Sequence, residues 1–227
     1  MPVLAERGKE REMSASEEDW PTEVLHGGEP MPRNIAKNQR IVDAVPRSLA
    51  LHWTFSAGAK LKYVLDLRSQ DREVQLHRKV ICELNASDVS VQIYAILRGN
   101  NHQRISLDLH LHHGASHTHS VTYICTVAED SSRIRTIAKI SAAERIECCD
   151  AHLQNRNLLL SPAASVETTP ILDIQSNDIR CSHGATVSGP RPDEIFYLRS
   201  RGISEVVARQ IIRDAFIAQA TGNQPND

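Results

Sequence analysis

Apolar and polar side chains alternate in short stretches from about residue 41 to about residue 190, which is the pattern of β-strands rather than helices. The clearest stretch covers residues 104–112. Its polar side chains fall on one face and its apolar side chains on the other, the apolar set being Ile105, Leu107, Leu109 and Leu111. This period of two predicts a strand with one buried face.

Further short strands are predicted at residues 122–128, 133–140, 145–153, 157–160, 165–167, 171–174 and 178–183. Clusters of Gly, Pro, Ser, Asn and Asp separate them, and these residue types favour turns. No convincing helical period occurs in this region. Many short strands joined by small-residue turns fit a sandwich, a barrel or a β-solenoid, and without a clean repeat length the pattern leaves all three open.

The C-terminal part of the chain changes character. Pro190 and Pro192 interrupt the strand pattern, and the acidic residues directly after them favour the start of a helix that runs to about residue 200. Ser204 can cap a second helix that extends to about residue 220. The apolar stripe of this helix comprises Ile203, Val207, Ile211, Ala215 and Ala218. The stripe either packs on the end of the β-domain or docks a partner, and the pattern does not decide between the two.

The chain therefore divides into four segments. Residues 1–38 are polar and carry more acidic than basic side chains, so we expect them to be mostly disordered. Residues 39–190 form an all-β core, residues 191–220 form a helical segment, and residues 221–227 form a frayed tail.

The composition is that of an ordinary soluble domain. The chain has 227 residues, 41% of them hydrophobic and 24% charged, with a net charge of −2 that argues against a general nucleic-acid binder. No apolar run approaches the roughly 18 to 20 residues that span a bilayer, and the N-terminus lacks a signal-peptide pattern. Five cysteines without framework spacing argue against a secreted disulfide scaffold. We therefore expect a cytoplasmic protein with reduced thiols.

Cys181 and His183 are the most informative candidates for chemistry. They stand two residues apart in a predicted strand, so their side chains share a face and their Cα atoms lie roughly 6.6 Å apart. A thiolate and an imidazole are both ligands for transition metals. Ser182 lies between them, but no acidic residue is placed to orient the His183 imidazole, so a hydrolase triad is weakly supported.

A run of histidines is the second candidate. It comprises His110, His112, His113, His117 and His119, and imidazoles on one strand face can bind zinc or iron. A small metal-dependent enzyme built on this run is therefore an alternative function, with His112 and His113 as weaker candidate metal ligands. A solvated polar face explains the same residues without chemistry.

Three stretches resemble one known family. They are Asp150-Ala-His-Leu-Gln-Asn-Arg-Asn-Leu-Leu-Leu-Ser161, then Pro170-Ile-Leu-Asp-Ile174 running into Asp178-Ile-Arg-Cys-Ser-His-Gly-Ala-Thr186, then Phe196-Tyr-Leu-Arg-Ser-Arg-Gly-Ile203. In this order they resemble the C-terminal region of the SufB/SufD scaffold subunits of the SUF iron–sulfur cluster assembly system. The resemblance covers about residues 105–218, and its Cys-Ser-His-Gly stretch is more similar to SufD than to SufB.

The resemblance implies a fold and a function. The expected fold is a right-handed parallel β-helix followed by two α-helices, and the expected function is a non-catalytic scaffold. Cys181 and His183 would hold iron or a nascent iron–sulfur cluster at an interface with a SufB-like subunit or a second copy of this chain. The C-terminal helices would recruit a SufC-like ABC ATPase through Phe196, Tyr197, Arg199, Arg201, Ile203, Val207 and Ile211. A third alternative is a β-solenoid that only docks the ATPase and has no cluster chemistry.

Overall fold

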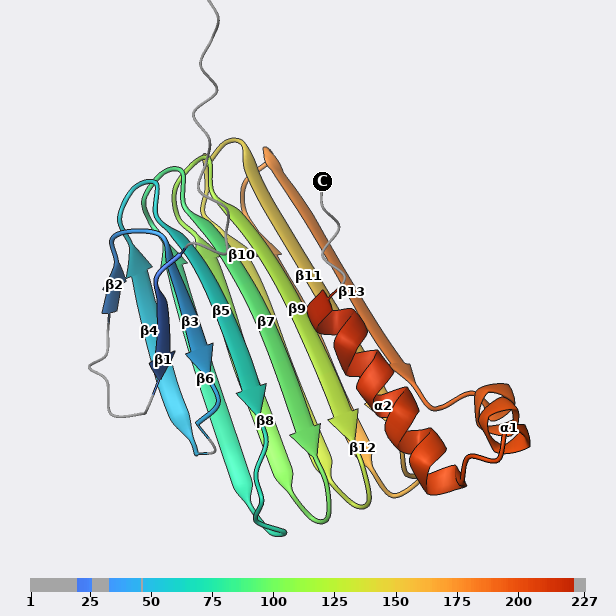
Figure 1. The fold of residues 1–227 in the computed structure, drawn as a ribbon. Coiled ribbons are helices and arrows are strands. Elements are labelled where there is room, and N and C mark those ends of the chain that lie inside the picture. Colours follow the sequence, from blue (N-terminus) through green and yellow to red (C-terminus); the bar gives the residue numbers. More distant parts are fainter. Residues whose placement is uncertain (1–19, 26–32, 46, 223–227) are drawn as a thin grey trace, which may run out of the picture.

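The computed structural model describes residues 20–25, 33–45 and 47–222. It is a parallel β-solenoid followed by two helices, as the resemblance implied (Figure 1). The strands are β1 (Thr22–Leu25), β2 (Arg33–Ile35), β3 (Gln39–Asp43), β4 (Leu49–Phe55), β5 (Lys60–Leu67), β6 (Gln75–Leu84), β7 (Ser90–Gly99), β8 (Arg104–His113), β9 (His119–Ala128), β10 (Arg133–Ala142), β11 (Cys149–Leu159), β12 (Ser165–Ile174) and β13 (Ile179–Ser188). The helices are α1 (Pro192–Ser200) and α2 (Glu205–Gly222).

The strands form two sheets that face each other. Odd-numbered strands make one sheet in the order β1-β3-β5-β7-β9-β11-β13, and even-numbered strands make the other in the order β12-β10-β8-β6-β4-β2. Pairs of neighbouring strands within each sheet are parallel, as in β8 with β10 and β9 with β11. The chain therefore crosses to the opposite sheet after each strand, and each coil stacks on the one before it.

The coils differ in length. Stacking of β8 on β10 sets Arg104 beside Arg133, a step of 29 residues, whereas β10 and β12 set Arg133 beside Ser165, a step of 32. Near the N-terminal end, β3 and β5 set Gln39 beside Leu61, a step of only 22. Because the turns and the early strands vary in length, the sequence shows no fixed repeat although the architecture repeats.

Aliphatic side chains fill the interior of the middle coils. Leu65 of β5, Ala95 of β7 and Ile124 of β9 stack in register and are all buried. Each strand contributes every second side chain to such ladders, which explains the alternation of apolar and polar positions. The few aromatic residues suit an interior this narrow.

Buried polar side chains lie among the aliphatic ones inside the last coils. Asn155 of β11 donates hydrogen bonds to the Thr136 hydroxyl of β10 at 2.8 Å and to the Thr168 hydroxyl of β12 at 2.5 Å. Asn157 donates to the Thr186 carbonyl of β13 at 2.9 Å. These bonds join one sheet to the other and the penultimate coil to the last.

One corner of four successive coils uses a left-handed backbone conformation. Gly58, Asp88, His117 and Cys148 all have φ between 54° and 72°, and each lies where the chain passes from the even to the odd sheet. Glycine adopts this conformation without steric cost, and Asp and His adopt it more readily than most residues. Two residues that could be taken for metal ligands, His117 and Cys148, therefore occupy turn positions.

The β-core begins earlier than expected. β1 and β2 lie within residues 1–38, which we expected to be disordered, because β1 pairs with β3 and β2 pairs with β4. Leu25 and Ile35 are thereby buried, and Arg33 donates to Glu23 at 2.6 Å. The expectation was wrong for these two strands, and residues 1–19 and 26–32 lie outside the described residues.

Two predicted strand breaks do not occur. Residues 145–153 and 157–160 belong largely to a single strand, β11, and residues 165–167 and 171–174 belong to β12. Thr169 and Pro170, which lie between two of the predicted strands, are not in a turn but inside β12. Pro170 is accommodated because β12 is the last strand of its sheet and pairs only with β10 among the described strands, so one of its edges needs no backbone donors.

Both C-terminal helices form where the sequence predicted them. Ser204 caps α2, with the Val207 amide donating to its hydroxyl at 3.4 Å, and Glu205 pairs with Arg209 at 2.9 Å. The stretch 223–227, expected to fray, lies outside the described residues. Neither helix has the length and apolar character needed to cross a membrane, within the residues that the structure describes.

The core-facing side of α2 differs from the predicted stripe. Ile212, Phe216 and Ile217 pack against a cluster of Val127, Leu158 and Leu160 on the odd sheet. Figure 1 shows α2 lying along this sheet beside β9 and β11, with α1 beyond the strand ends. Val207 and Ile211, which belong to the predicted stripe, remain 44% and 42% exposed. The helix thus has two apolar sides, and the period alone could not tell which one is buried.

A buried ion pair stabilises the N-terminal end of the solenoid. Arg78 contacts Asp43 at 3.2 Å and donates to the Val45 carbonyl at 2.9 Å, while the Tyr63 hydroxyl donates to Asp43 at 2.6 Å. Both charged side chains are fully buried. A charge left alone in this position has no solvent to stabilise it.

Asp43→Ala should therefore lower the free energy of unfolding by about 3 to 5 kcal/mol, because it leaves the Arg78 guanidinium buried without its counter-charge. Urea unfolding followed by the fluorescence of buried Trp53, whose ring lies 4.7 Å from that of Tyr63, measures the change. Asp66→Ala is the control, because it removes the partner of a half-exposed arginine, Arg98, and should cost about 1 kcal/mol or less. Equal losses in the two variants would contradict the prediction.

Candidate functional site

Cys181 and His183 lie on the last strand of the odd sheet. In β13, Cys181 is in register with Ala151 and His183 with Leu153 of β11. Strand alternation places both on one face, as their spacing predicted. Cys181 is half-buried and packs at the margin of the core, whereas His183 is exposed.

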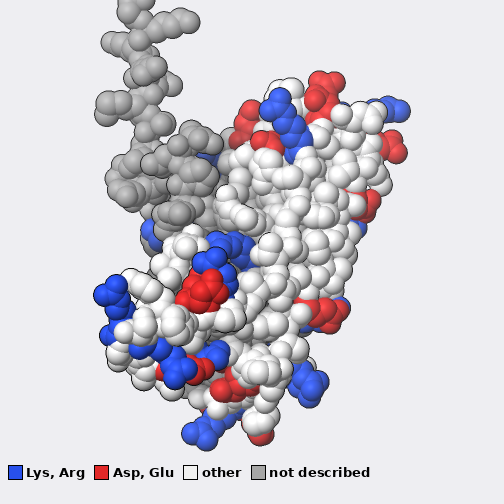
Figure 2. Space-filling model, turned by 90° about the vertical axis from the view of Figure 1, so that its right-hand side faces the viewer, with Lys and Arg blue, Asp and Glu red and all other residues white. Residues whose placement is uncertain are grey.

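The solenoid is open at this end. Among the described strands, β13 pairs only with β11 and β12 only with β10, so one backbone edge of each is unpaired. Ile174 and Ile179 are only half-buried there, and Ile171, Leu172 and Val187 are 36% to 51% exposed. Figure 2 views the molecule from this side and shows a long band free of Lys, Arg, Asp and Glu. Such an edge is a template for another strand.

The surroundings of Cys181 favour the neutral form of its thiol. Burial raises its pKa, and the negative charge of Asp150 raises it further. A thiolate is the form that binds metals. Binding of a cation by Cys181 is therefore coupled to loss of the thiol proton.

Ser182 faces away from Cys181 and His183 and contacts a different histidine. Its hydroxyl lies 2.5 Å from Nδ1 of His152. The other ring nitrogen, Nε2, lies 2.9 Å from a carboxylate oxygen of Asp150, but the angle of this contact does not suit a hydrogen bond. Asp150 and His152 stand two apart on the outer face of β11, and the β11–β13 register brings His152 beside Ser182. The sequence alone does not reveal this partner, because Ser182 and His152 are 30 residues apart and meet only through the β11–β13 register. The contact fastens the outer face of β13 to β11.

The histidine run does not form one group. His110 and His112 lie on the outer face of β8, whereas His113 is fully buried inside the solenoid and His117 sits in the left-handed corner. His112 and His113 point to opposite sides of the sheet, so they cannot bind the same ion. In the described part of the chain, no three His, Cys, Asp or Glu side chains are placed to hold a metal ion.

His110 and His112 converge on one hydroxyl. Nε2 of His110 lies 2.8 Å and Nδ1 of His112 lies 2.9 Å from Oγ of Ser141 on β10. Partial burial and the nearby positive charge of Lys139 lower the pKa of His110. The pair is a hydrogen-bonded polar surface, which matches the simpler of the two interpretations of this run.

His113 belongs to a buried network. Its Nδ1 lies 2.8 Å from the Thr118 hydroxyl and its Nε2 2.8 Å from the Ser120 hydroxyl. Thr118 donates to the Ala115 carbonyl at 3.0 Å, so it accepts from Nδ1–H, and Ser120 donates to Nε2. Both ring nitrogens are satisfied in the neutral form. Burial is the main reason that the pKa of His113 falls to about 4.

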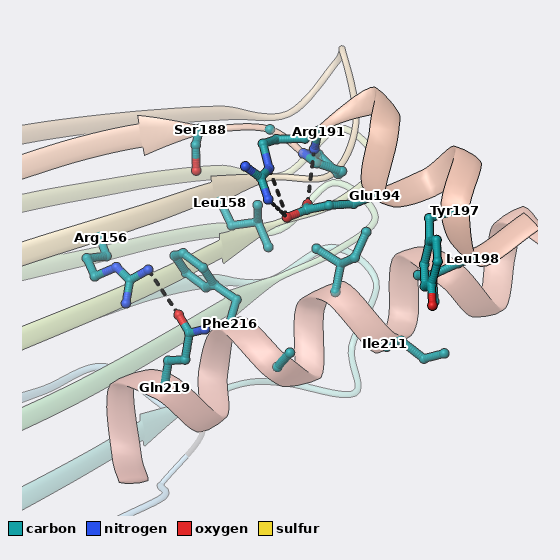
Figure 3. A pocket seen from close by; sticks show the side chains of 14 residues that line it. Arg156, Leu158, Ser188, Arg191, Glu194, Tyr197, Leu198, Ile211, Phe216 and Gln219 are labelled. Atoms are coloured by element: carbon teal, nitrogen blue, oxygen red, sulfur yellow. Dashed lines mark hydrogen bonds and ion pairs between the residues drawn. The ribbon is translucent and has the colours of Figure 1, made fainter. Parts of the chain in front are cut away.

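A hollow of about 450 Å³ lies between the two helices and the ends of β11 and β13 (Figure 3). Apolar side chains line it, among them Leu158, Ile211 and Phe216. Arg156 stacks 5.0 Å from the Phe216 ring and donates to Gln219 at 3.2 Å, while Arg191 pairs with Glu194 at its other end. The Arg156 contacts hold α2 against the sheet, whereas the Arg191–Glu194 pair lies within the first turn of α1.

The helices expose apolar side chains away from the sheet. Phe196 and Tyr197 of α1 are 74% and 58% exposed, and Val206 of α2 is 68% exposed. Arg201 lies 5.5 Å from the Tyr197 ring, and Arg199 pairs with Glu205 at 3.6 Å. Ile203, in the turn between the helices, is only half-exposed. Most residues expected to dock a partner are therefore accessible.

Comparisons with known proteins converge on one family. A family model described as SUF system FeS cluster assembly, SufBD core domain, matches residues 56–216. The iron–sulfur cluster assembly protein SufD of Escherichia coli (strain K12) is 32% identical over 146 residues, which cover 64% of this chain and 34% of that protein. A SufBD family protein of Synechocystis sp. is 36% identical over 121 residues, covering 52% of this chain and 26% of the relative.

A third relative, a SufBD family protein of Pyrococcus horikoshii, is 30% identical over 127 residues, covering 56% of this chain and 28% of its own length. The chain thus spans about a third or less of the curated relatives that it matches. The matched region begins at Ser56 and so extends further toward the N-terminus than the resemblance seen in the motifs.

Stability should fall as the pH drops from 6.5 toward 4, because His113 gains a proton readily in the unfolded chain but not in the fold. The difference between the two pKa values corresponds to a decrease of about 3 kcal/mol in the free energy of unfolding, and this decrease is complete below pH 4. Urea unfolding at several pH values measures it, and His113→Asn should lose this part of the pH dependence. An unchanged pH dependence in the variant would show that other groups cause it.

Proposed function

Because the chain belongs to the SufBD core family of the SUF system, we propose that it is a scaffold in iron–sulfur cluster assembly and not a catalyst. The three relatives described above carry iron–sulfur cluster assembly in their names, one as a SufD protein and two as SufBD family proteins. The observation that carries the proposal is the open end of the solenoid, where Cys181 and His183 lie on an unpaired edge strand.

The site at this end is half of a cluster site. A thiolate and an imidazole supply two ligands, whereas iron–sulfur clusters take four. The unpaired edges of β12 and β13 and the uncharged band beside them suit a partner that adds its own strands. We propose a SufB-like subunit or a second copy of this chain as that partner, which brings the remaining ligands and encloses the iron or the nascent cluster as cargo.

The raised pKa of the Cys181 thiol fits a transient role. A neutral thiol binds iron only as it gives up its proton, and an imidazole is a weaker anchor for a cluster than a thiolate. Cargo held by these two groups leaves more readily than cargo held by four thiolates. Separation of the two subunits would then release it.

The double variant Cys181→Ser/His183→Ala should lose cluster formation when it is incubated anaerobically with iron, sulfide and the SufB-like partner. Visible absorbance of the isolated complex measures the cluster, and size-exclusion chromatography measures pairing. Cys148→Ser is the matched control, because Cys148 is an exposed thiol in the corner turn before β11. Wild-type absorbance in the double variant would refute the assignment, whereas lost absorbance with intact pairing would support it.

We further propose that the exposed sides of α1 and α2 recruit a SufC-like ABC ATPase. Phe196, Tyr197, Val207 and Ile211 are exposed apolar side chains of the two helices, and Arg199 and Arg201 are exposed near them along the chain. Aromatic side chains and arginines of this kind carry most of the binding energy in protein interfaces. The ATPase cycle would then act on the open end through the α2–sheet contact.

Phe196→Asp should weaken binding of the ATPase at least about tenfold, because it places a charge in an apolar contact. Val24→Asp is the control, since Val24 is a 50% exposed apolar side chain on β1, far from the helices in the sheet order. Surface plasmon resonance with the immobilised ATPase measures both variants. If Phe196→Asp binds as the wild type does, the docking surface lies elsewhere, and the cluster experiment is unaffected.

A further inference from the structure

A group of arginines lies on the outer face of the even sheet, opposite the side that carries α2. Arg104 begins β8 and Arg133 begins β10, and the two are in direct register. Both are exposed, so their guanidinium groups extend from neighbouring strands roughly 4.8 Å apart. Arg135 follows on the same face of β10.

The first two of these arginines are not neutralised. Within the described residues, neither Arg104 nor Arg133 has an ion pair or a hydrogen bond through its side chain. Arg135 has one distant, exposed partner, Glu167 at 3.8 Å. Like charges in register on adjacent strands are destabilising. Some other exposed arginines of this chain have a close carboxylate partner, as Arg191 has in Glu194 at 2.7 Å.

The arginines line a hollow of about 670 Å³ at the start of β8, β10 and β12. In the row that contains Arg104 and Arg133, Gln75 of β6 and Ser165 of β12 are the flanking neighbours. All four side chains of this row offer hydrogen-bond donors. Among the described residues that line the hollow, Glu167 is the only one with a carboxylate, against three arginines, so the lining carries an excess of positive charge.

We propose that this hollow binds the phosphate group of a small phosphorylated solute. Two adjacent guanidinium groups can donate to the oxygens of one phosphate in bidentate fashion, and the hydroxyl and amide donors beside them reach its remaining oxygens. A divalent anion also removes the repulsion between Arg104 and Arg133. The volume of the hollow lies in the range of small-molecule sites, which favours a solute over a flat protein surface.

The test is titration of the whole chain with inorganic phosphate and with pyrophosphate, against sodium chloride at equal ionic strength. Chemical shifts in the amide NMR spectrum report binding and locate it. The wild type should show saturable shifts at the start of β8, β10 and β12, and pyrophosphate should bind more tightly than phosphate. The double variant Arg104→Gln/Arg133→Gln should weaken binding at least about tenfold.

The matched control is Lys60→Gln/Lys79→Gln, which removes two exposed positive charges outside the hollow and should bind as the wild type does. Equal weakening in both double variants would show that net charge alone attracts the anion and would overturn the site. Absence of saturable shifts in the wild type would also overturn it. Binding to vesicles containing phosphatidic acid, without a response to the free anions, would assign the surface to a membrane and refute a solute site.

Discussion

Parallel stacking of coils is the constraint on which the rest of this structure depends. Each strand hydrogen-bonds to the strands one coil before and one coil after it, and each inward side chain packs on its register neighbours, as Leu65, Ala95 and Ile124 do. A stack of this kind has no natural end. At the last coil, one backbone edge of β12 and of β13 is unpaired among the described strands, and inward side chains such as Ile179 and Cys181 are only partly covered. The architecture itself therefore presents the candidate ligands at a surface that gains from being covered.

The side chains inside the solenoid become more polar toward this open end. In the middle coils most inward side chains are aliphatic, so dispersion and burial supply most of the attraction between the two sheets. Buried polar contacts such as that of His113 with Ser120 are the exceptions. In the last coils Asn155 ties β11 to β10 and β12, and Asn157 ties it to β13. Hydrogen bonds contribute more of the stability in these coils, because the last coil has less apolar surface to bury. They fix the last strand in place without help from a following coil.

The sequence predicts the strands and the direction of their side chains, but it does not predict which residues of neighbouring strands lie side by side. Alternation identified β8, and the spacing of Cys181 and His183 placed them on one face, because side-chain direction depends only on neighbouring residues. The two-sheet arrangement, the partnership of Ser182 with His152 and the unpaired arginines depend on which residues lie one coil apart. Steps of 22 to 32 residues conceal that relation. The same gap explains why β1 and β2 were missed, since they are short and polar and become strands only by pairing with β3 and β4.

The left-handed corner positions mark the repeat of this architecture along the sequence. Gly58, Asp88, His117 and Cys148 follow one another at intervals of 30, 29 and 31 residues, and each marks the same point of its coil. At each turn the alternation of apolar and polar residues is interrupted, so it no longer shows which residues of the next strand point inward. The left-handed positions supply a fixed reference point, because the backbone there tolerates only a few residue types well. In related chains, a Gly, Asn, Asp or His recurring at this interval would count the coils and assign inward and outward faces before any contact is known.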